Sequence, residues 1–475
     1  MGDGSNRDAR GPSPMMKIPL EITTQIFIVC KDNVLDDRYK APTKHSILDV
    51  RRAPLLLCHV CSQWRTVAQG TPRLWNFVCL LTQDVVSDRK ILAIRALLGL
   101  SKSLLLTVEV VSRRPVFTRS RNTEFLHRMW EFHHRLENIR IDVYSYDVAP
   151  NSLPPPTVLA HLQSLSIYII EDTPDVVFPT LLGLFRLSPS LRALELEASN
   201  YVIYIDIPSL IFTPDFFPWQ QLTRLKSLLN ITTITARDVL YLCRGLEVCE
   251  LGSIKSGDVP GEAPWIHDQM RSLKLRTLRD IPFTGFFDSL AFPCLENLTL
   301  GYFQVPINSL LRLHERSPFH LKSLKISCPR FTPDEVIQFL RLQPCLETIC
   351  LSQCDESGDL FRAFTYRGAT GSAQFTLLRL TRLEFCENYR ETRWYEVTDP
   401  TPGPAVAEFA ESLVEYPGDH NPCFPLLGPV HLYLDGIEFP DDVEDRLASV
   451  CSAGYLIDHQ VEYRRNEYDY DSEEE

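Results

Sequence analysis

Residues 321–351, with the sequence LKSLKISCPRFTPDEVIQFLRLQPCLETICL, contain one complete repeat unit of the chain. The unit opens with three apolar residues, Leu321, Leu324 and Ile326. The last two are two positions apart, so in a strand their side chains share one face. A helix is expected from Pro333, because a threonine precedes this proline and a glutamate stands at the third helical position. The stretch therefore predicts a strand followed by a helix that covers its apolar face.

The same apolar pattern recurs along most of the chain. Between Ile139 and Ile349, its middle positions are separated by 26, 29, 31, 24, 24, 25, 26 and 25 residues. Arrays of helix pairs such as HEAT repeats need about 40 residues per unit, whereas one strand and one helix fit this period. We therefore expect an α/β solenoid, with a parallel sheet on its concave side and helices on its convex side. The middle positions are Ile139, Leu165, Leu194, Leu225, Cys249, Leu273, Leu298, Leu324, Ile349, Leu383 and Val430.

This repeat resembles the leucine-rich repeat. Residues between the buried positions point away from the core, so they form a candidate surface for binding another protein. Mixed charge and two aromatic residues suit a protein better than a phosphate backbone. The alternative is a solvated sheet face without a single partner. The candidate residues are Tyr168, Glu195, Glu197, Lys274, Lys325, Glu384, His431 and Tyr433.

A different pattern precedes the repeats. Pro19 suits the first turn of a helix, and Ile22, Ile26 and Val29 follow it at helical spacing. Residues 53–68, APLLLCHVCSQWRTVA, predict a second helix with its own apolar stripe. Two short amphipathic helices cannot bury all of their apolar faces against each other, so one face is left for a partner.

These helices resemble the F-box, in the F-box-like form common in fungal proteins. The resemblance lies in Pro-Leu-x-Glu-Ile from Pro19, the Val-Cys-x-x-Trp-Arg helix from Val60, and Thr-Pro-x-Leu-Trp from Thr71. The chain departs from the family between Lys31 and Arg52, where a long polar segment is expected to loop out. The resemblance implies docking to a small adaptor subunit and, through it, to a cullin-RING ubiquitin ligase. It assigns the contacts or their support to Pro19, Leu20, Ile22, Ile26, Phe27, Val60, Trp64, Leu74 and Trp75.

Four segments are expected from these patterns. The first is disordered, the second is the F-box-like domain, the third is the solenoid and the fourth is an acidic, solvated tail. The solenoid ends with a helix near Val443 to Val450. Long loops rich in glycine, proline and charge interrupt it at 352–378 and 387–424. The four segments are 1–17, 18–82, 83–450 and 451–475.

The composition restricts the functions that this chain can have. The 475 residues include 48 basic and 61 acidic side chains, which give a net charge of −13. This charge argues against general binding to nucleic acid or to anionic membranes. We find neither an apolar signal core at the N-terminus nor a run of membrane-spanning length. The cytoplasm or the nucleus is therefore the expected location, with mostly buried free thiols.

No catalytic, metal or cofactor site is expected. The Cys-x-x-Cys pair at Cys58 and Cys61 stands alone, whereas structural zinc needs about four ligands. His127, His133 and His134 also lack nearby acidic or cysteine ligands. The favoured function is a non-enzymatic substrate receptor of an SCF-type ligase. The alternatives are a repeat scaffold whose helix pair only caps the solenoid, and a thiol enzyme that uses Cys58 or Cys61.

Overall fold

The chain divides into two compact units, Met1–Gln221 and Leu222–Glu475, and each is described by itself. The predicted boundary at residue 82 remains a prediction. The structure is a computed structural model. It describes residues 18–36, 46–82, 88–112, 124–144, 148, 153–170, 174–198, 212–213, 215–255, 264–282, 284–304, 307–327, 333–352, 361–362, 365, 380–386, 403–415, 431–435, 439–452 and 457–460.

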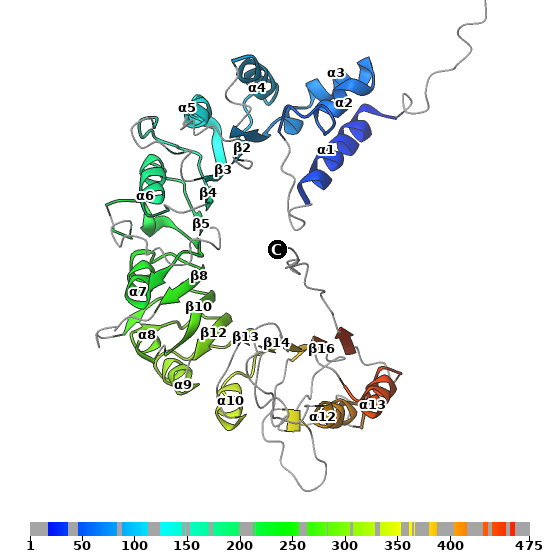
Figure 1. The fold of residues 1–475 in the computed structure, drawn as a ribbon, viewed down its shortest axis with the longest axis vertical. Coiled ribbons are helices and arrows are strands. Elements are labelled where there is room, and N and C mark those ends of the chain that lie inside the picture. The colour runs from blue at the N-terminus through cyan, green and yellow to red at the C-terminus, as the bar shows by residue number, and fades with distance from the viewer. Residues whose placement is uncertain are drawn as a thin grey trace, which may run out of the picture. The chain divides into compact units, whose positions relative to one another are not determined.

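The first unit begins with helices and continues into a parallel sheet. The initial helices are α1 (Leu20–Asp36), α2 (Leu55–Val60), α3 (Ser62–Gly70) and the 3-10 turn η3 (Pro72–Leu74). Five neighbouring strands follow in chain order: β1 (Phe77–Leu81), β2 (Leu106–Val111), β3 (Leu136–Tyr144), β4 (Ser164–Ile170) and β5 (Ala193–Ala198). Figure 1 shows three helices on one side of these strands, α4 (Asp88–Leu100), α5 (Glu124–Trp130) and α6 (Pro174–Leu184). The 3-10 turns η5 (His133–Arg135) and η10 (Trp219–Gln221) complete the unit.

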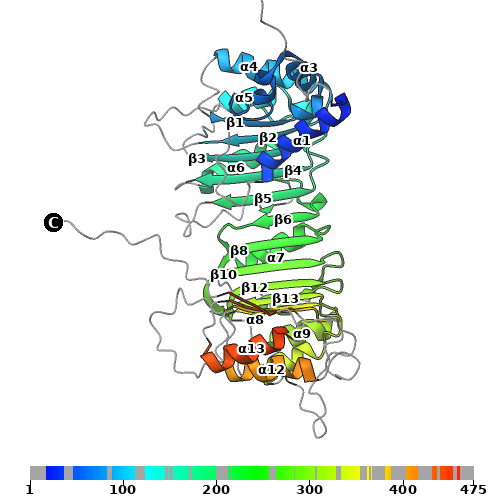
Figure 2. The same cartoon turned by 90° about the vertical axis from the view of Figure 1, so that its right-hand side faces the viewer.

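The second unit repeats the strand–helix alternation. In Figure 2 its strands from β8 to β13 are seen side by side in one sheet. The parallel strands are β6 (Arg224–Ser227), β8 (Val248–Lys255), β10 (Ser272–Pro282), β12 (Asn297–Gln304), β13 (Ser323–Ser327), β14 (Thr348–Ser352), β15 (Arg382–Cys386), β16 (His431–Asp435) and β17 (Ile457–Gln460). The short strands are β7 (Ile231–Thr232), which pairs with β8, and the pair β9 (Trp265–Ile266) and β11 (Leu290–Ala291). The helices are α7 (Thr233–Leu242), α8 (Thr284–Asp288), α9 (Ile307–Arg316), α10 (Pro333–Leu340), α12 (Gly403–Glu415) and α13 (Asp441–Ser452).

The predicted pattern of buried residues is confirmed by the strand register. Leu273 lies beside Cys249 on one neighbouring strand and beside Leu298 on the other, and all three are buried. Burial alternates along β4, β13 and β14, with buried residues on the helix side. The α/β class and the parallel sheet are therefore confirmed, and the helical-array alternative is wrong.

A recurring backbone hydrogen bond holds successive repeats in register. The N–H groups of Arg271 and Ser272 both donate to the carbonyl of Glu247, at 2.9 and 3.0 Å. The carbonyl of Arg271 in turn accepts from Glu296 and Asn297, each at 2.9 Å. One carbonyl with two lone pairs satisfies two donors. These shared carbonyls therefore hold each strand in register with the strand before it.

The repeat begins earlier than expected. Val78 of β1 lies beside Val108 of β2, and Val108 lies beside Ile139, where the sequence pattern was first recognised. Trp75 stands three residues before Val78, in the place that Leu136 takes before Ile139. Trp75 thus belongs to a strand–helix unit as well as to the segment that resembles the F-box.

Two predictions near the end of the chain are wrong. Helix α12 lies inside the expected loop 387–424, because Ala405, Val406 and Phe409 form a buried helical stripe. The last repeat copy was placed two residues too early, since Leu383 pairs with Leu432 and not with Val430. Val430 itself lies outside the described residues.

Other predictions in the two units have mixed outcomes. The closing helix is confirmed as α13, but β17 follows it within the segment expected to be an acidic tail. In the expected loop 352–378, Phe361 is buried and its ring centroid is 5.8 Å from that of Phe409. The expected disorder of 1–17 and the acidic residues after 460 lie outside the described residues.

Two expectations for the N-terminal helices also need correction. The segment predicted to loop out from Lys31 is helical as far as Asp36, because Lys31 is held inside the fold. The second helix is interrupted at Cys61, whose extended backbone (φ −157°, ψ 172°) separates α2 from α3. The Cys61 sulfur caps α3 by accepting from the Trp64 N–H at 3.4 Å.

Candidate functional site

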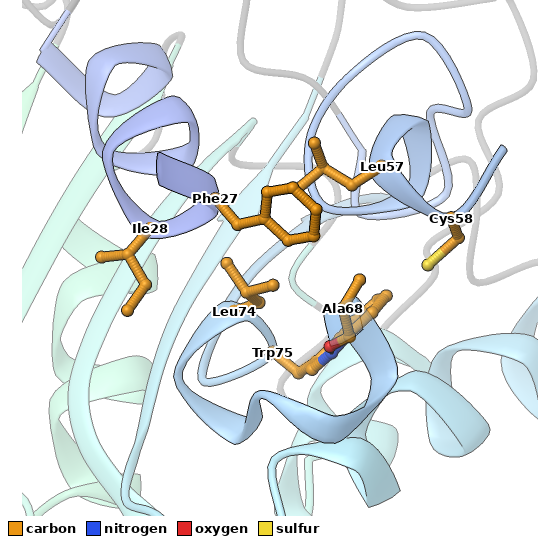
Figure 3. Close-up of a cluster of buried hydrophobic side chains, with 7 residues drawn as sticks. All are labelled: Phe27, Ile28, Leu57, Cys58, Ala68, Leu74 and Trp75. Carbon is orange, nitrogen blue, oxygen red and sulfur yellow. The ribbon is translucent and has the colours of Figure 1, made fainter. Parts of the chain in front are cut away.

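The N-terminal helices are assembled around a compact apolar core. Phe27 of α1 is fully buried and meets the Trp64 ring of α3 edge-on, with ring centroids 4.9 Å apart. Leu74 and Trp75, at the end of η3, are also fully buried. Figure 3 shows how side chains from α1, α2, α3 and η3 converge. The cluster comprises Phe27, Ile28, Leu57, Cys58, Ala68, Leu74 and Trp75.

Polar contacts fix the helices on this core. The Lys31 ammonium donates to the Arg73 carbonyl at 2.8 Å and to Asn76 Oδ1 at 3.0 Å. Trp75 Nε1 donates to the Ala68 carbonyl at 2.8 Å. A buried ammonium needs such partners, because its desolvation is costly. Helix α1 is therefore held against η3 by both apolar packing and a charged hydrogen-bond donor.

Helix α1 carries a second apolar face on the side away from this core. Ile22, Ile26 and Val29 follow one another at spacings of four and three residues, which places them on one helical face. Their exposed fractions are 52%, 38% and 53%. On α2, Leu56 and Val60 are 45% and 54% exposed. We call Ile22, Ile26 and Val29 the helical docking face.

The structure separates the residues that the F-box resemblance had grouped together. Pro19, Leu20, Ile22, Ile26 and Val60 are exposed and available for contact. Phe27, Leu74 and Trp75 are buried and support the helices, while Trp64 is half-buried against Phe27. Val29 and Leu56 were missing from the predicted site. The sequence could have predicted Val29, because it follows Ile26 at helical spacing and so shares its face.

The cysteines of the Cys-x-x-Cys pair have structural surroundings. Burial raises the pKa of the Cys58 thiol, and the charge of Arg65 opposes that shift. A raised pKa leaves less of the nucleophilic thiolate at neutral pH. Cys61 is half-buried and caps α3, as described above. These positions do not favour a thiol-dependent reaction.

No group of three or more potential ligands is placed to hold a metal within the part of the chain that the structure describes. His133 and His134 stack edge-on with centroids 5.6 Å apart, and His133 Nδ1 lies 2.9 Å from the Trp130 carbonyl.

Within the described ranges, none of the helices has both the length and the apolar character that crossing a bilayer requires.

The sheet face of the first unit carries mainly negative charge. Tyr168 lies beside Asp142 on one strand and Glu197 on the other, in a common register row. Burial raises the pKa of Tyr168, and the charges of Asp142 and Glu197 raise it further. Ser166 donates to Glu195 at 2.9 Å. All three predicted residues in this unit, Tyr168, Glu195 and Glu197, are partly exposed.

The predicted residues of the second unit also share one sheet face, and several pair laterally. Lys274 Nζ lies 2.7 Å from Glu250, and Lys325 Nζ lies 3.7 Å from Glu384. Glu384 also contacts Arg382 and is buried. Lys274 and Lys325 remain partly exposed.

The aromatic end of this face lies on β16. Tyr433 pairs in register with Glu384, and His431 pairs with Arg382. The Arg382 guanidinium lies 6.0 Å from the centre of the Tyr433 ring. His431 and Tyr433 are both partly exposed. All eight predicted face residues therefore lie on strands, three of them in the first unit and five in the second.

Comparison with known proteins does not place the chain in a family. No protein-family model matches the sequence, and no match is found among curated proteins.

Proposed function

We propose that this protein is a non-enzymatic substrate receptor of an SCF-type cullin-RING ubiquitin ligase. Its N-terminal helices dock the adaptor subunit as an F-box does, and its strand–helix units form leucine-rich repeats that bind the target. The observation that carries the proposal is the pair of opposite apolar faces on α1. One face is buried on Phe27 and Ile28, while the other exposes Ile22, Ile26 and Val29.

Covering the exposed face of α1 with a partner would stabilise a complex. Burying apolar surface contributes roughly 25 cal/mol per Å² removed from water. Three branched aliphatic residues on one helical face favour association with a complementary surface, because isolated exposed apolar residues are common but clustered ones mark contact sites. Two of them, Ile22 and Ile26, are residues that the F-box resemblance assigns to the adaptor contacts or their support.

The repeat units support the second half of the proposal. Parallel strands in register with intervening helices present one open face, whose side chains are mainly polar and charged. Such a surface suits recognition of a protein. In this proposal the chain acts in the cytoplasm or nucleus, and ubiquitin transfer belongs to other subunits.

The first test is co-purification of the full-length chain with the adaptor subunit. We expect wild type to retain the adaptor and Ile22→Ser/Val29→Ser to lose it, with an unchanged melting temperature. Leu92→Ser is the matched control, because Leu92 is an aliphatic residue on α4 that is 61% exposed. This control should retain the adaptor. Absence of the adaptor from wild type, or equal loss in the control, would contradict the proposal.

The second candidate is a repeat scaffold with no ligase connection. The charged sheet faces support it as well, because they can bind a partner without the helices. Wild-type chain that binds proteins through the sheet but never the adaptor would favour this candidate.

A further inference from the structure

A row of lysines crosses the sheet of the second unit. Lys226 on β6 and Lys274 on β10 both pair with Glu250 of the intervening strand. Lys274 and Lys325 on β13 both pair with Thr299 of β12. The three lysines, which we call the lysine row, therefore occupy the same register position on alternate strands.

The spacing of the lysine row matches an extended polypeptide. Neighbouring strands are about 4.8 Å apart, so lysines on alternate strands are separated by roughly 10 Å. A polyproline II segment advances about 3.1 Å per residue with three residues per turn, so every third side chain recurs on the same side at roughly the same distance. A segment that runs across the strands can therefore place one side chain over each lysine.

The charge of this area is opposite to that of the whole chain. At the paired register positions of β6, β8, β10, β12 and β13, the described outward side chains include five cations and one carboxylate, although the net charge of the protein is −13. The carboxylate, Glu250, already lies 2.7 Å from Lys274 and 3.8 Å from Arg276. The five cations are Arg224, Lys226, Lys274, Arg276 and Lys325.

Small side chains occupy the positions between these cations. Gly301 of β12 lies beside Arg276, and a Cβ added there would be 3.2 Å from Arg276 Cγ. The glycine thus lets the arginine stem lie across the neighbouring strand. The other outward side chains that the structure describes on β12 and β13 belong to asparagine, threonine, serine and lysine.

We propose that the lysine row binds an extended acidic segment of a partner protein, with a carboxylate at every third residue. The segment lies across β6 to β13, and Arg224 and Arg276 add charge beside the row. The identity of this segment as a ligase target rests on the proposed function above. Its binding to the sheet does not require the adaptor.

A peptide fits these observations better than a nucleic acid. None of the described outward positions from β6 to β13 carries an aromatic ring, whereas single-stranded nucleic acids bind through stacking on such rings. The carboxylate of Glu250 also stands inside the row, where it would oppose a continuous phosphate backbone.

The test measures binding of labelled probes to the full-length protein by fluorescence anisotropy. The first probe is a 15-residue Ser/Gly peptide with glutamate at every third position, and the second has the same composition with its glutamates clustered. We expect the regular peptide to bind at least about threefold more tightly, and its affinity to fall as salt rises. Equal binding of both peptides would overturn the spacing argument.

Variants locate the binding surface. Lys226→Gln/Lys274→Gln/Lys325→Gln should weaken binding of the regular peptide by about tenfold or more. The matched control is Arg271→Gln/Lys322→Gln, which removes two exposed cations that pair with Glu296 at 3.1 and 2.9 Å. The control should bind as wild type does. Equal weakening in both variants would overturn the proposal.

Two further outcomes would assign the surface to another occupant. Tighter binding of single-stranded DNA than of the regular peptide would replace the peptide with nucleic acid. A tenfold gain in peptide affinity for Glu473→Gln/Glu474→Gln/Glu475→Gln would indicate that the chain's own acidic residues occupy the row. Loss of adaptor binding alone leaves this proposal intact, because the peptide assay contains no adaptor.

Discussion

At the scale of single residues, buried polar side chains connect one repeat to the next. Gln343 is fully buried, and its Oε1 accepts from the Leu321 N–H at 2.9 Å. Its Nε2 lies 3.3 Å from His314 Nδ1. Gln343 stands in the turn before β14, whereas Leu321 stands before β13. The side chain thus satisfies a backbone donor that the parallel ladder leaves unpaired.

Replacing Gln343 with leucine removes the acceptor for this buried N–H. A buried donor left without a partner costs about 1–3 kcal/mol, so Gln343→Leu should lower the free energy of unfolding by that amount. Chemical denaturation checks the value. Gln338→Leu on α10 is the control, because Gln338 is exposed, and its effect should stay within about 0.5 kcal/mol. Equal effects would show that the buried hydrogen bond contributes little.

At the scale of elements, α1 combines a structural face with a docking face. Phe27 packs on Trp64, while Val29, two residues later, points to solvent. A two-residue step turns an α-helix by about 200°, so these residues lie on nearly opposite sides. Both residues are apolar, so hydrophobicity alone does not show which one is buried and which one is exposed.

Substitutions on the two faces of α1 should have different effects. Phe27→Ala should destabilise the first unit by about 3–5 kcal/mol, because it leaves a cavity in the core. Val29→Ser should change stability by no more than about 0.5 kcal/mol, because the valine is largely in water. Thermal unfolding of both variants checks this. A large loss of stability in Val29→Ser would mean that the docking face is part of the folded core.

At the scale of the whole molecule, several titrating groups act on stability in the same direction. Burial lowers the pKa of His267 and of His314 below the ordinary 6.5, although the hydrogen bond of His267 to the Cys243 carbonyl opposes the shift. The hydrogen bond from Lys322 lowers the pKa of Glu296, and that from Arg446 lowers the pKa of Glu411, below the ordinary 4.5. In each case the folded chain binds a proton less readily than the unfolded chain.

Stability should therefore fall as the solution is acidified. The histidines act first, from about pH 6.5 downward, because the unfolded chain gains protons there while the folded chain resists them. The two glutamates add to the loss below about pH 4.5. Melting temperatures between pH 7.5 and 4 check this. His267→Gln should reduce the slope between pH 7 and 5.5, and an unchanged slope would exclude His267 as a main contributor.

The local periodicities of the sequence were enough to predict much of the fold. Leucine spacing near 25 residues predicted strand–helix units, although the array already begins at β1, before the first recognised copy. Helix α12 was missed because glycine, proline and charge around it obscured the stripe of Ala405, Val406 and Phe409. The break at Cys61 was missed because apolar residues continue at helical spacing through it.

The sequence by itself determined the repeat, the α/β class and the presence of apolar helices near the N-terminus, because these depend on spacing within some 30 residues. Only the tertiary structure decided that Phe27 is buried and Ile22 exposed, since helix packing selects one of two apolar faces. It also aligned Lys226, Lys274 and Lys325, which are 48 and 51 residues apart. That alignment depends on the register of five strands, which backbone hydrogen bonds between distant segments establish.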